Sequence, residues 1–280
     1  MEKTFGVAGG GPRGAELVRL LKRDGYSVSA YGVGADSGAA ENADALENAL
    51  GADVVILPVP LFAPDGTLNC PGAGLPEPEL LAKFRPGQRV FAGLIPPETM
   101  RRARDAGVSM SDYMAHEPMA IANAAATADA ALCLTVQETR ETLAGKRCLV
   151  LGFGRIGKLL CCRLQGAGAT VTAAARNPDD RAWICAFGWT ALDASALAGR
   201  LGGFRIAYNT IPVPILDAEL LRELPPDCFV MDLASKAGVD MEAASALGLA
   251  AVWARGLPGR VVPRGAAAIL RDTALSLLKE

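Results

Sequence analysis

Histidine is nearly absent from this chain of 280 residues, which contains only His116. A metal site built from several histidines is therefore excluded. A histidine-based catalytic triad would have to use His116, because no second histidine is present. We interpret His116 as a residue at the start of a helix rather than as a catalyst. No C-x-x-C pair occurs, and the sequence shows no metal site. Scattered cysteines predict reduced, mostly buried thiols; they are Cys70, Cys133, Cys148, Cys161, Cys162, Cys185 and Cys228.

Aromatic residues are also few, at 5%, and neither sign of charge dominates, since the net charge is −2. The chain therefore gives no reason to expect binding to nucleic acid or to a membrane surface. Its longest apolar stretch, Met119 to Val136, is interrupted by Asn123 and Asp129 and makes a poor membrane span. The first residues, MEKTFGVAGGG, lack the basic-then-apolar pattern of a signal peptide, so we expect a cytoplasmic protein.

What the chain does have is enough apolar sequence for two packed domains, with 51% hydrophobic and 21% charged residues. Short apolar runs alternate with helical patterns, which is typical of parallel α/β sheets. In the first half the expected strands are Thr4–Ala8, Ser27–Tyr31, Asp53–Pro58, Val90–Leu94 and Val108–Met110. In the second half they are Cys148–Leu151, Thr170–Ala175, Arg205–Asn209, Cys228–Leu233 and Ala250–Ala254.

These elements predict an α/β fold with two doubly wound, Rossmann-like domains joined by long helices. The expected linking helix is His116–Leu143, and a shorter helix is expected at Ala194–Leu201. We expect a first domain at residues 1–118, completed by a C-terminal helix at 265–280. A linking segment at 119–144 and a second domain at 145–264 follow. The loop from Pro58 to Pro78 is long for a compact domain, and such loops are often functional.

A glycine-rich turn between two strands of the second domain is the most informative motif. It reads Gly152-Phe153-Gly154-Arg155-Ile156-Gly157 and opens a helix after a buried strand. In a dinucleotide-binding unit the first glycine makes the tight turn and the second lets the backbone approach a pyrophosphate. The third allows close packing of helix on strand. The helix N-terminus offers N–H groups and a positive dipole end to the anion.

The residue that closes the second strand of this unit indicates which cofactor is bound. An NAD site has Asp or Glu about 20 residues after the glycines, where it binds the ribose 2′-hydroxyl. This chain has Arg176 there, followed by Asn177 and, one turn on, Arg181. A guanidinium pairs with a 2′-phosphate, whereas a carboxylate would repel it. The sequence favours NADP, with NAD as the alternative; the structural alternative is a solvated Arg176.

The first domain repeats the glycine pattern in Gly9-Gly10-Gly11-Pro12-Arg13-Gly14, again between a strand and a helix. Its second strand ends in Tyr31-Gly32-Val33-Gly34, which offers neither an acid nor a base to a ribose. We therefore expect a poor cofactor site here. Two interpretations of Arg13 stay open: a solvated residue in the first helical turn, or a cation presented with the helix N-terminus to a substrate carboxylate.

Polar turns follow three strands of the second domain, at the sheet edge where open α/β folds bind ligands. The turns are Asn209-Thr210-Ile211-Pro212, Asp232-Leu233-Ala234-Ser235-Lys236 and Arg255-Gly256-Leu257-Pro258-Gly259. The full set of expected cofactor contacts is Gly152, Gly154, Arg155, Ile156, Gly157, Arg176, Asn177, Asn209, Thr210, Ile211, Pro212, Asp232, Leu233, Ala234 and Pro258.

Taken together and in this order, the motifs resemble the A subunit family of dipicolinate synthase. The resemblance rests on GFGRIG with Ala175-Arg176-Asn177, on the turns at Asn209–Pro212, Asp232–Ser235 and Gly256–Gly259, and on Gly9-Gly10-x-x-Arg13 and Ile56-Leu57-Pro58. It covers essentially the whole chain. The linking helix departs from the family pattern Asn-x-x-Pro-Thr-x-Glu-Gly, because Asn123 to Ala130 reads NAAATADA.

The resemblance implies a two-domain layout like that of the D-2-hydroxyacid dehydrogenases, with the substrate between the domains. It implies oxidation of a dihydrodipicolinate-level intermediate of the diaminopimelate pathway to dipicolinate, the calcium-chelating acid of bacterial spores, and hence a role in sporulation. A flavoprotein-like B subunit is the implied partner, and a homodimer is the other assembly left open.

A small ring dicarboxylate needs cations or helix ends to hold it, and a base for the proton released with the hydride. We expect Arg13 to hold one carboxylate, with Asn123 and Thr127 on one helix face as hydrogen-bonding partners. Lys236 could hold the second carboxylate or orient the substrate, and Asp129 is the candidate proton acceptor. The structural alternatives are a solvated turn for Lys236 and a locally satisfied, buried helix acid for Asp129.

Two other functions compete with this one. A dehydrogenase for another small carboxylic acid would share the layout, but the usual Glu and His pair downstream of the Rossmann unit is missing. A non-catalytic NADP-binding subunit is kept open by the changed motif on the linking helix. A methyltransferase fits least, since adenosylmethionine sites favour an acid at the position of Arg176.

Overall fold

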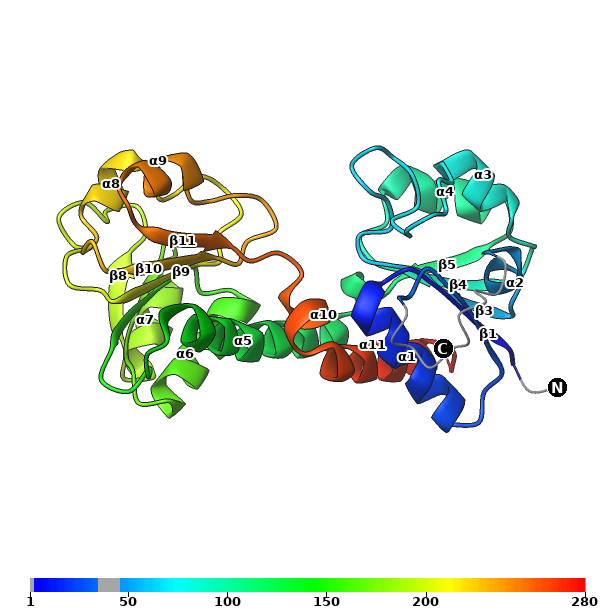
Figure 1. Ribbon diagram of the computed structural model, residues 1–280, viewed down its shortest axis with the longest axis horizontal. Coiled ribbons are helices and arrows are strands. Elements are labelled where there is room, and N and C mark those ends of the chain that lie inside the picture. Colours follow the sequence, from blue (N-terminus) through cyan, green and yellow to red (C-terminus); the bar gives the residue numbers. More distant parts are fainter. Residues whose placement is uncertain (1–2, 35–45, 280) are drawn as a thin grey trace. The chain divides into compact units, whose positions relative to one another are not determined.

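The computed structural model describes residues 3–34 and 46–279. The chain divides into two compact units, one of Met1–Asn123 with Pro258–Glu280 and the other of Ala124–Leu257 (Figure 1). We refer to them as the first unit and the second unit. The division falls within the long helix expected to link the domains, so that helix is shared between the units rather than forming a separate segment.

The first unit is built on a parallel sheet with strand order β2-β1-β3-β4-β5. The strands are β1 (Phe5–Ala8), β2 (Val28–Tyr31), β3 (Val54–Ile56), β4 (Arg89–Ala92) and β5 (Ser109–Asp112). Alternate strand residues face opposite sides: Val54 and Ile56 enter one apolar core and Val55 the other. Both faces of the sheet are therefore buried, as its short, continuously apolar strands predict.

Helices cover both faces of this sheet. They are α1 (Gly11–Arg23), α2 (Leu46–Leu50), α3 (Glu77–Ala82), α4 (Pro97–Asp105), α10 (Leu257–Val261), α11 (Pro263–Leu277) and the 3-10 turn η2 (Tyr113–Ala115). The C-terminal helix α11 lies beside α1 (Figure 1), and its Ala267 and Leu270 share a core with Leu17. Arg271 of α11 also pairs with Asp24 just after α1, at 3.2 Å. The end of the chain thus completes the first unit.

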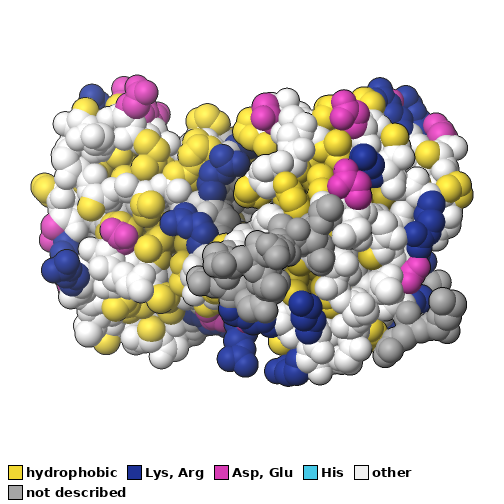
Figure 2. Space-filling view, turned by 45° about the vertical axis from the view of Figure 1, so that its right-hand side comes forward, with side chains coloured by type: hydrophobic (Ala, Val, Ile, Leu, Met, Phe, Trp, Pro, Cys, Tyr) yellow, Lys and Arg dark blue, Asp and Glu magenta, His cyan; other side chains and the backbone are white. Residues whose placement is uncertain are grey.

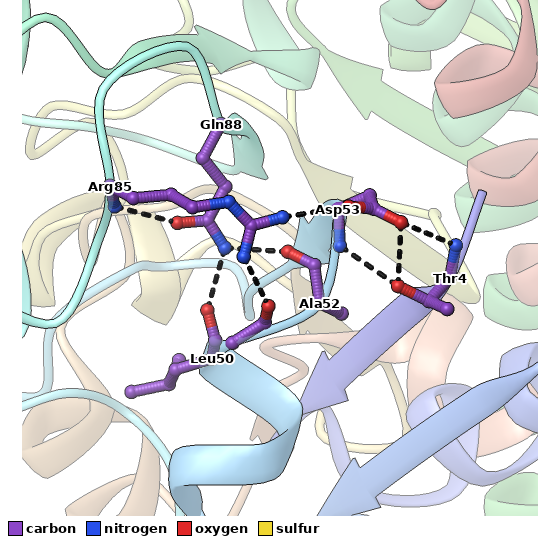
Figure 3. A network of polar contacts seen from close by, with 7 residues as sticks. Thr4, Leu50, Ala52, Asp53, Arg85 and Gln88 are labelled. Carbon is purple, nitrogen blue, oxygen red and sulfur yellow. Dashed lines mark hydrogen bonds and ion pairs between the residues drawn. The ribbon is translucent and has the colours of Figure 1, made fainter. Parts of the chain in front are cut away.

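A polar network ties together the amino ends of strands in the first unit (Figure 3). Gln88, which is 3% exposed, donates to the carbonyl oxygens of Leu50 and Ala52 at 2.7 and 2.6 Å. Asp53 accepts from the Thr4 backbone N–H at 3.0 Å and from Arg85 at 2.7 Å, and the Thr4 hydrogen bonds lower the pKa of Asp53. This edge of the sheet is cross-linked, and the opposite, carboxyl edge is the one available to ligands.

The second unit has a parallel six-stranded sheet with order β11-β10-β9-β6-β7-β8. Its strands are β6 (Arg147–Leu151), β7 (Thr170–Ala175), β8 (Thr190–Asp193), β9 (Ile206–Asn209), β10 (Phe229–Asp232) and β11 (Ala250–Trp253). Its helices are α6 (Arg155–Gly166), α7 (Pro178–Ala186), α8 (Ala218–Arg222) and α9 (Met241–Ala246). Read from β8, the order is the 3-2-1-4-5-6 arrangement of dinucleotide-binding sheets, with its switch point between β6 and β9. The predicted fold class is confirmed.

The long helix α5 (Glu117–Thr139) is shorter than expected. It ends at Thr139 and not at Leu143, because Arg140 takes a left-handed backbone with φ 55° and stops the helix. An 18-residue window of α5 has a mean hydropathy of 1.5, and the helix is long enough to cross a membrane, a test that core helices of soluble proteins also pass. Thr135 of α5 is fully buried and forms a 2.8 Å hydrogen bond with the Tyr208 hydroxyl of β9, so this part of the helix packs against the second sheet.

One expected helix is absent from the second unit: residues 194–201 form turns instead. Asp193, which ends β8, accepts a hydrogen bond from the Ser195 backbone N–H at 2.8 Å, and Gly199 has φ 74°. Local side-chain bonding of this kind competes with helix formation. The helical spacing of Ala194 to Leu201 therefore reflects burial of Ala194, Leu197 and Leu201 in the core, without a helix.

Candidate functional site

The glycine turn of the second unit connects β6 to α6. Gly152 has φ 97°, a conformation that side chains disfavour, and its N–H donates to the Ala174 carbonyl at 2.9 Å. A Cβ on Gly157 would lie 2.1 Å from the Gly152 oxygen, so the helix packs against the turn only with glycine at this position. Gly152 is therefore required by its backbone conformation, and Gly157 by the close packing of the helix on the turn.

Gly154 differs from its two neighbours because it faces open space. A Cβ built there meets no heavy atom within 4 Å. The helix that follows, α6, has neither a side-chain cap nor an acidic residue in its first turn. The positive end of α6 thus lies beside an open backbone position, as a dinucleotide pyrophosphate requires. The turn fits a nicotinamide dinucleotide, whose phosphates Gly154, Arg155 and Ile156 would hold.

Arg176 extends from the carboxyl end of β7 and is exposed. Over residues 3–34 and 46–279 its guanidinium has no hydrogen bond or ion pair. Its neighbours are committed to the fold: Asn177 caps α7 by accepting from the Asp179 N–H at 3.0 Å. Arg181 donates to the carbonyl oxygens of Ala175 and Arg176 and pairs with Asp193 at 3.3 Å. Of these three residues, only Arg176 has a side chain available to a ligand.

The turns after β9 and β10 are held by a buried pair of side chains, Asn209 and Asp232. Both are 0% exposed, and the Asn209 amide donates to Asp232 at 2.9 Å. The other bonds to Asp232 come from three backbone N–H groups: Ala234 at 3.0 Å, Gly238 at 2.7 Å and Val239 at 3.1 Å. Asn209 also accepts from the Ile211 N–H at 3.0 Å.

This network changes the roles expected for the two residues. Asn209 and Asp232 are predicted above to contact the cofactor, but their polar atoms are turned inward and bonded to the protein. They shape the turns that a ligand would meet. Leu233 and Ala234 are likewise buried, Thr210 and Ile211 are half-buried, and Pro212 is exposed. Gly238, which the sequence reasoning missed, is needed because a Cβ there would lie 2.3 Å from the Asn209 amide nitrogen.

The residues expected to act on the substrate are distributed over both units. Arg13 and Asn123 belong to the first unit, and Thr127, Asp129 and Lys236 to the second. Thr127 is buried, whereas Asp129 is exposed and pairs with Arg163 of α6 at 2.9 Å. Lys236 lies exposed in the turn after β10. Pro258 starts the second part of the first unit, in α10, and stays a predicted cofactor contact.

A further cation lies in the polar turn after β11 and was not among the expected cofactor contacts. Arg255 stands two residues after the end of β11, and its guanidinium carbon lies 4.9 Å from the ring centroid of Trp253. The indole N–H of Trp253 donates to the Ala234 carbonyl at 2.9 Å, which ties this strand end to the turn after β10. The signal in the sequence is a basic residue just after the expected strand Ala250–Ala254, the same kind of signal that indicated Arg176.

The buried cysteines Cys70, Cys148 and Cys228 offer no thiolate nucleophile, whereas Cys133, Cys162 and Cys185 are exposed. All seven are unpaired, and burial raises the pKa of Cys70 to about 11 and those of Cys148 and Cys228 to about 12. These thiols stay protonated at neutral pH. In the part of the chain that the structure describes, no group of three or more His, Cys, Asp or Glu residues could hold a metal ion.

Positive and negative side chains are interspersed on the face drawn in Figure 2.

Two sequence comparisons with known proteins both identify a similarity to the A subunit of dipicolinate synthase. The family of the N-terminal domain of the dipicolinate synthase A subunit matches residues 4–114. The A subunit of dipicolinate synthase from Bacillus subtilis (strain 168) is 31% identical over 192 residues. This match covers 68% of the chain and 65% of the relative, slightly less than two thirds of the relative's length.

Solved structures extend the similarity to the full length. The dipicolinate synthase A subunit from Bacillus halodurans matches with a TM-score of 0.81 and 28% identity, over 99% of this chain and 98% of that one. D-2-hydroxyisocaproate dehydrogenase matches with a TM-score of 0.56 and 14% identity, over 98% and 95% of the two chains, and so shares the fold alone. The sequence match and the full-length structural match name the same protein: the chain is a homologue of the dipicolinate synthase A subunit.

Proposed function

We propose that this chain is an NADP-dependent oxidoreductase that converts a dihydrodipicolinate-level ring compound into dipicolinate. The homology to the A subunit of dipicolinate synthase supports the substrate class, and the dehydrogenase fold is compatible with the reaction. The observation that carries the proposal is the open backbone at Gly154, next to the uncapped start of α6 and in the same unit as the exposed Arg176.

The cofactor preference follows from Arg176. A 2′-phosphate is the group that separates NADP from NAD, and a guanidinium forms charge-assisted, often bidentate hydrogen bonds with it. Asn177 and Arg181 are bonded within the fold, so Arg176 would supply the discrimination alone. NAD then binds through the same glycine turn but without this contact.

The chemistry supplied by the cofactor is acceptance of a hydride from a ring carbon. A proton leaves the substrate as well, and the ring becomes an aromatic pyridine. Because aromatisation drives the reaction, the proton needs no specially tuned base. Asp129 forms an ion pair with Arg163, and the proposed mechanism does not use it as the proton acceptor. The role that we assign to Lys236 is to hold one substrate carboxylate from the turn after β10, and Asn123 and Thr127 stay predicted hydrogen-bonding partners.

We also propose that the chain works with a second, different subunit, because its relatives are named as the A subunits of a synthase. The alternatives for this chain, oxidation of another small carboxylic acid and cofactor binding without turnover, are distinguished by experiment.

Titration of the purified chain with NADPH and NADH tests the cofactor site directly. The nicotinamide fluorescence is followed as the site fills, and calorimetry supplies an independent dissociation constant. We expect NADPH to bind roughly 100-fold more tightly than NADH, which is the size of effect that a charge-assisted contact to one phosphate gives. Equal affinity for both, or binding of neither, would contradict the proposal.

A further inference from the structure

A small pocket in the first unit lies at the carboxyl ends of β1 and β3. It is lined by backbone from Gly9 and Gly10, by Arg13, and by apolar side chains that include Leu57, Pro58 and Leu270. The first turn of α1 forms one side of it, because Arg13 is the third residue of that helix. All the residues that line the pocket belong to the first unit, and the pocket has its own helix N-terminus.

Arg13 is the buried cation of this pocket. It is 8% exposed, and within residues 3–34 and 46–279 its guanidinium forms no hydrogen bond or ion pair. The nearby Tyr113 offers no negative charge: burial raises the pKa of its phenol, which donates to the Leu57 carbonyl at 3.1 Å. Gly259 of α10 packs against the stem of Arg13, since a Cβ at Gly259 would lie 3.7 Å from the Arg13 Cβ.

The N-terminus of α1 adds to the positive electrostatic potential around Arg13. α1 has no acidic residue in its first turn and no side-chain cap, so its N-terminal dipole end is uncompensated. A buried cation at the positive end of a helix is unfavourable on two counts, desolvation and like polarity. Each cost is offset when an anion enters the pocket and takes hydrogen bonds from the guanidinium and from the helix.

The anion must be small, because the space that a dinucleotide would need is filled. The loop after β3 covers the ends of β1 and β2: a Cβ on Gly9 would lie 2.9 Å from the Asn69 oxygen. A Cβ on Gly32 would lie 2.5 Å from the Cys70 sulfur, and Tyr31 donates its hydroxyl to the Gly72 carbonyl at 3.0 Å. A ribose has no room at this strand end, and the small pocket beside Arg13 limits any group that enters it to the size of a carboxylate.

We propose that Arg13 and the N-terminus of α1 form the binding site for one carboxylate of a planar ring acid. Leu57 and Leu270 are packed in the core, so only the carboxylate of the acid would enter the pocket, where the guanidinium supplies a planar pair of donors. The identity of this acid as the substrate rests on the function proposed above. Arg13 is then a substrate-binding residue of the first unit.

Dipicolinate binding to the full chain in the absence of cofactor tests the site without requiring turnover. Calorimetry gives the dissociation constant, and thermal unfolding reports ligand stabilisation. Arg13→Met is expected to bind dipicolinate roughly 10- to 100-fold more weakly, the loss expected for hydrogen bonds to a charged group. Its Tm without ligand should equal or exceed that of the wild type, because a buried charge is gone. NADPH affinity should be unchanged.

Arg23→Met, at the exposed end of the same helix, is the matched control and should bind dipicolinate like the wild type. Arg13→Lys keeps the charge but loses the planar fork, so intermediate affinity is expected; it replaces Arg13→Met if that variant does not fold. Unchanged binding in both Arg13 variants would overturn the inference. So would stabilisation by inorganic phosphate that dipicolinate does not match. Arg13-dependent binding without turnover would instead leave this site standing and remove the proposed function.

Discussion

Replacing Arg176 with Glu should reverse the cofactor preference of this protein. We expect NADPH binding to weaken by at least about 100-fold, because a phosphate contact is lost and a like charge takes its place. NADH should bind as well as before or more tightly, since a carboxylate at the end of the second strand accepts hydrogen bonds from a ribose 2′-hydroxyl. Fluorescence titration with both reduced cofactors measures the two effects in the same samples.

Arg222→Glu is the matched control for this experiment. It makes the same charge change on another exposed arginine of the second unit, in the last turn of α8. A similar loss of NADPH affinity in Arg222→Glu would mean that net charge, and not a local contact, decides binding. If Arg176→Glu weakened NADPH and NADH equally, Arg176 would not lie at the 2′-phosphate, and the preference for NADP would lose its basis.

The second large effect is expected in the stability of the second unit. Asp232→Ala removes the acceptor for three backbone N–H groups and for the Asn209 amide, all in a buried site. Unmade hydrogen bonds of buried groups cost about 1–3 kcal/mol each before relaxation. Because water will enter and satisfy some of them, we expect a total loss of about 3–5 kcal/mol in the free energy of unfolding, measured by denaturant titration.

Asp217→Ala provides the comparison for that value. Asp217 caps α8 by accepting from the N–H groups of Glu219 and Leu220, both at 3.0 Å, and it is exposed. Loss of such a cap costs about 1 kcal/mol. The same chemical change should therefore be several times more harmful at Asp232. Equal losses would show that water replaces the buried network freely, and Asp232 would not be the residue that shapes the turn.

The sheets and the cofactor turn could be predicted from sequence because their signals are local. Short apolar runs such as Cys148–Leu151 place strands, and the spacing of Gly152, Gly154 and Gly157 reflects contacts within one strand, turn and helix. The side of the sheet at which ligands bind follows from the parallel topology. Arg176 was identified in the same way, as a basic residue at the end of a strand.

The properties that the sequence did not predict depend on distant contacts. Residues 194–201 carry helical spacing, yet the Asp193 side chain and Gly199 make turns of them. The inward orientation of Asp232 depends on Gly238 and Val239, which approach it only in the folded turn. The residues next to Arg13 in the sequence do not indicate whether its side chain is solvated or buried. Its burial comes from α10 and α11, more than 240 positions later in the chain.

Oxidation of the substrate itself is the most direct test of the proposed function. Purified chain is mixed with freshly generated product of dihydrodipicolinate synthase and with NADP or NAD in parallel, and the absorbance of reduced nicotinamide is followed while dipicolinate is quantified. We predict that reduced cofactor and dipicolinate form in equal amounts, faster with NADP, by the chain alone or once its partner is added. Absence of both products with and without the partner, in a chain that still binds NADPH, would contradict the account.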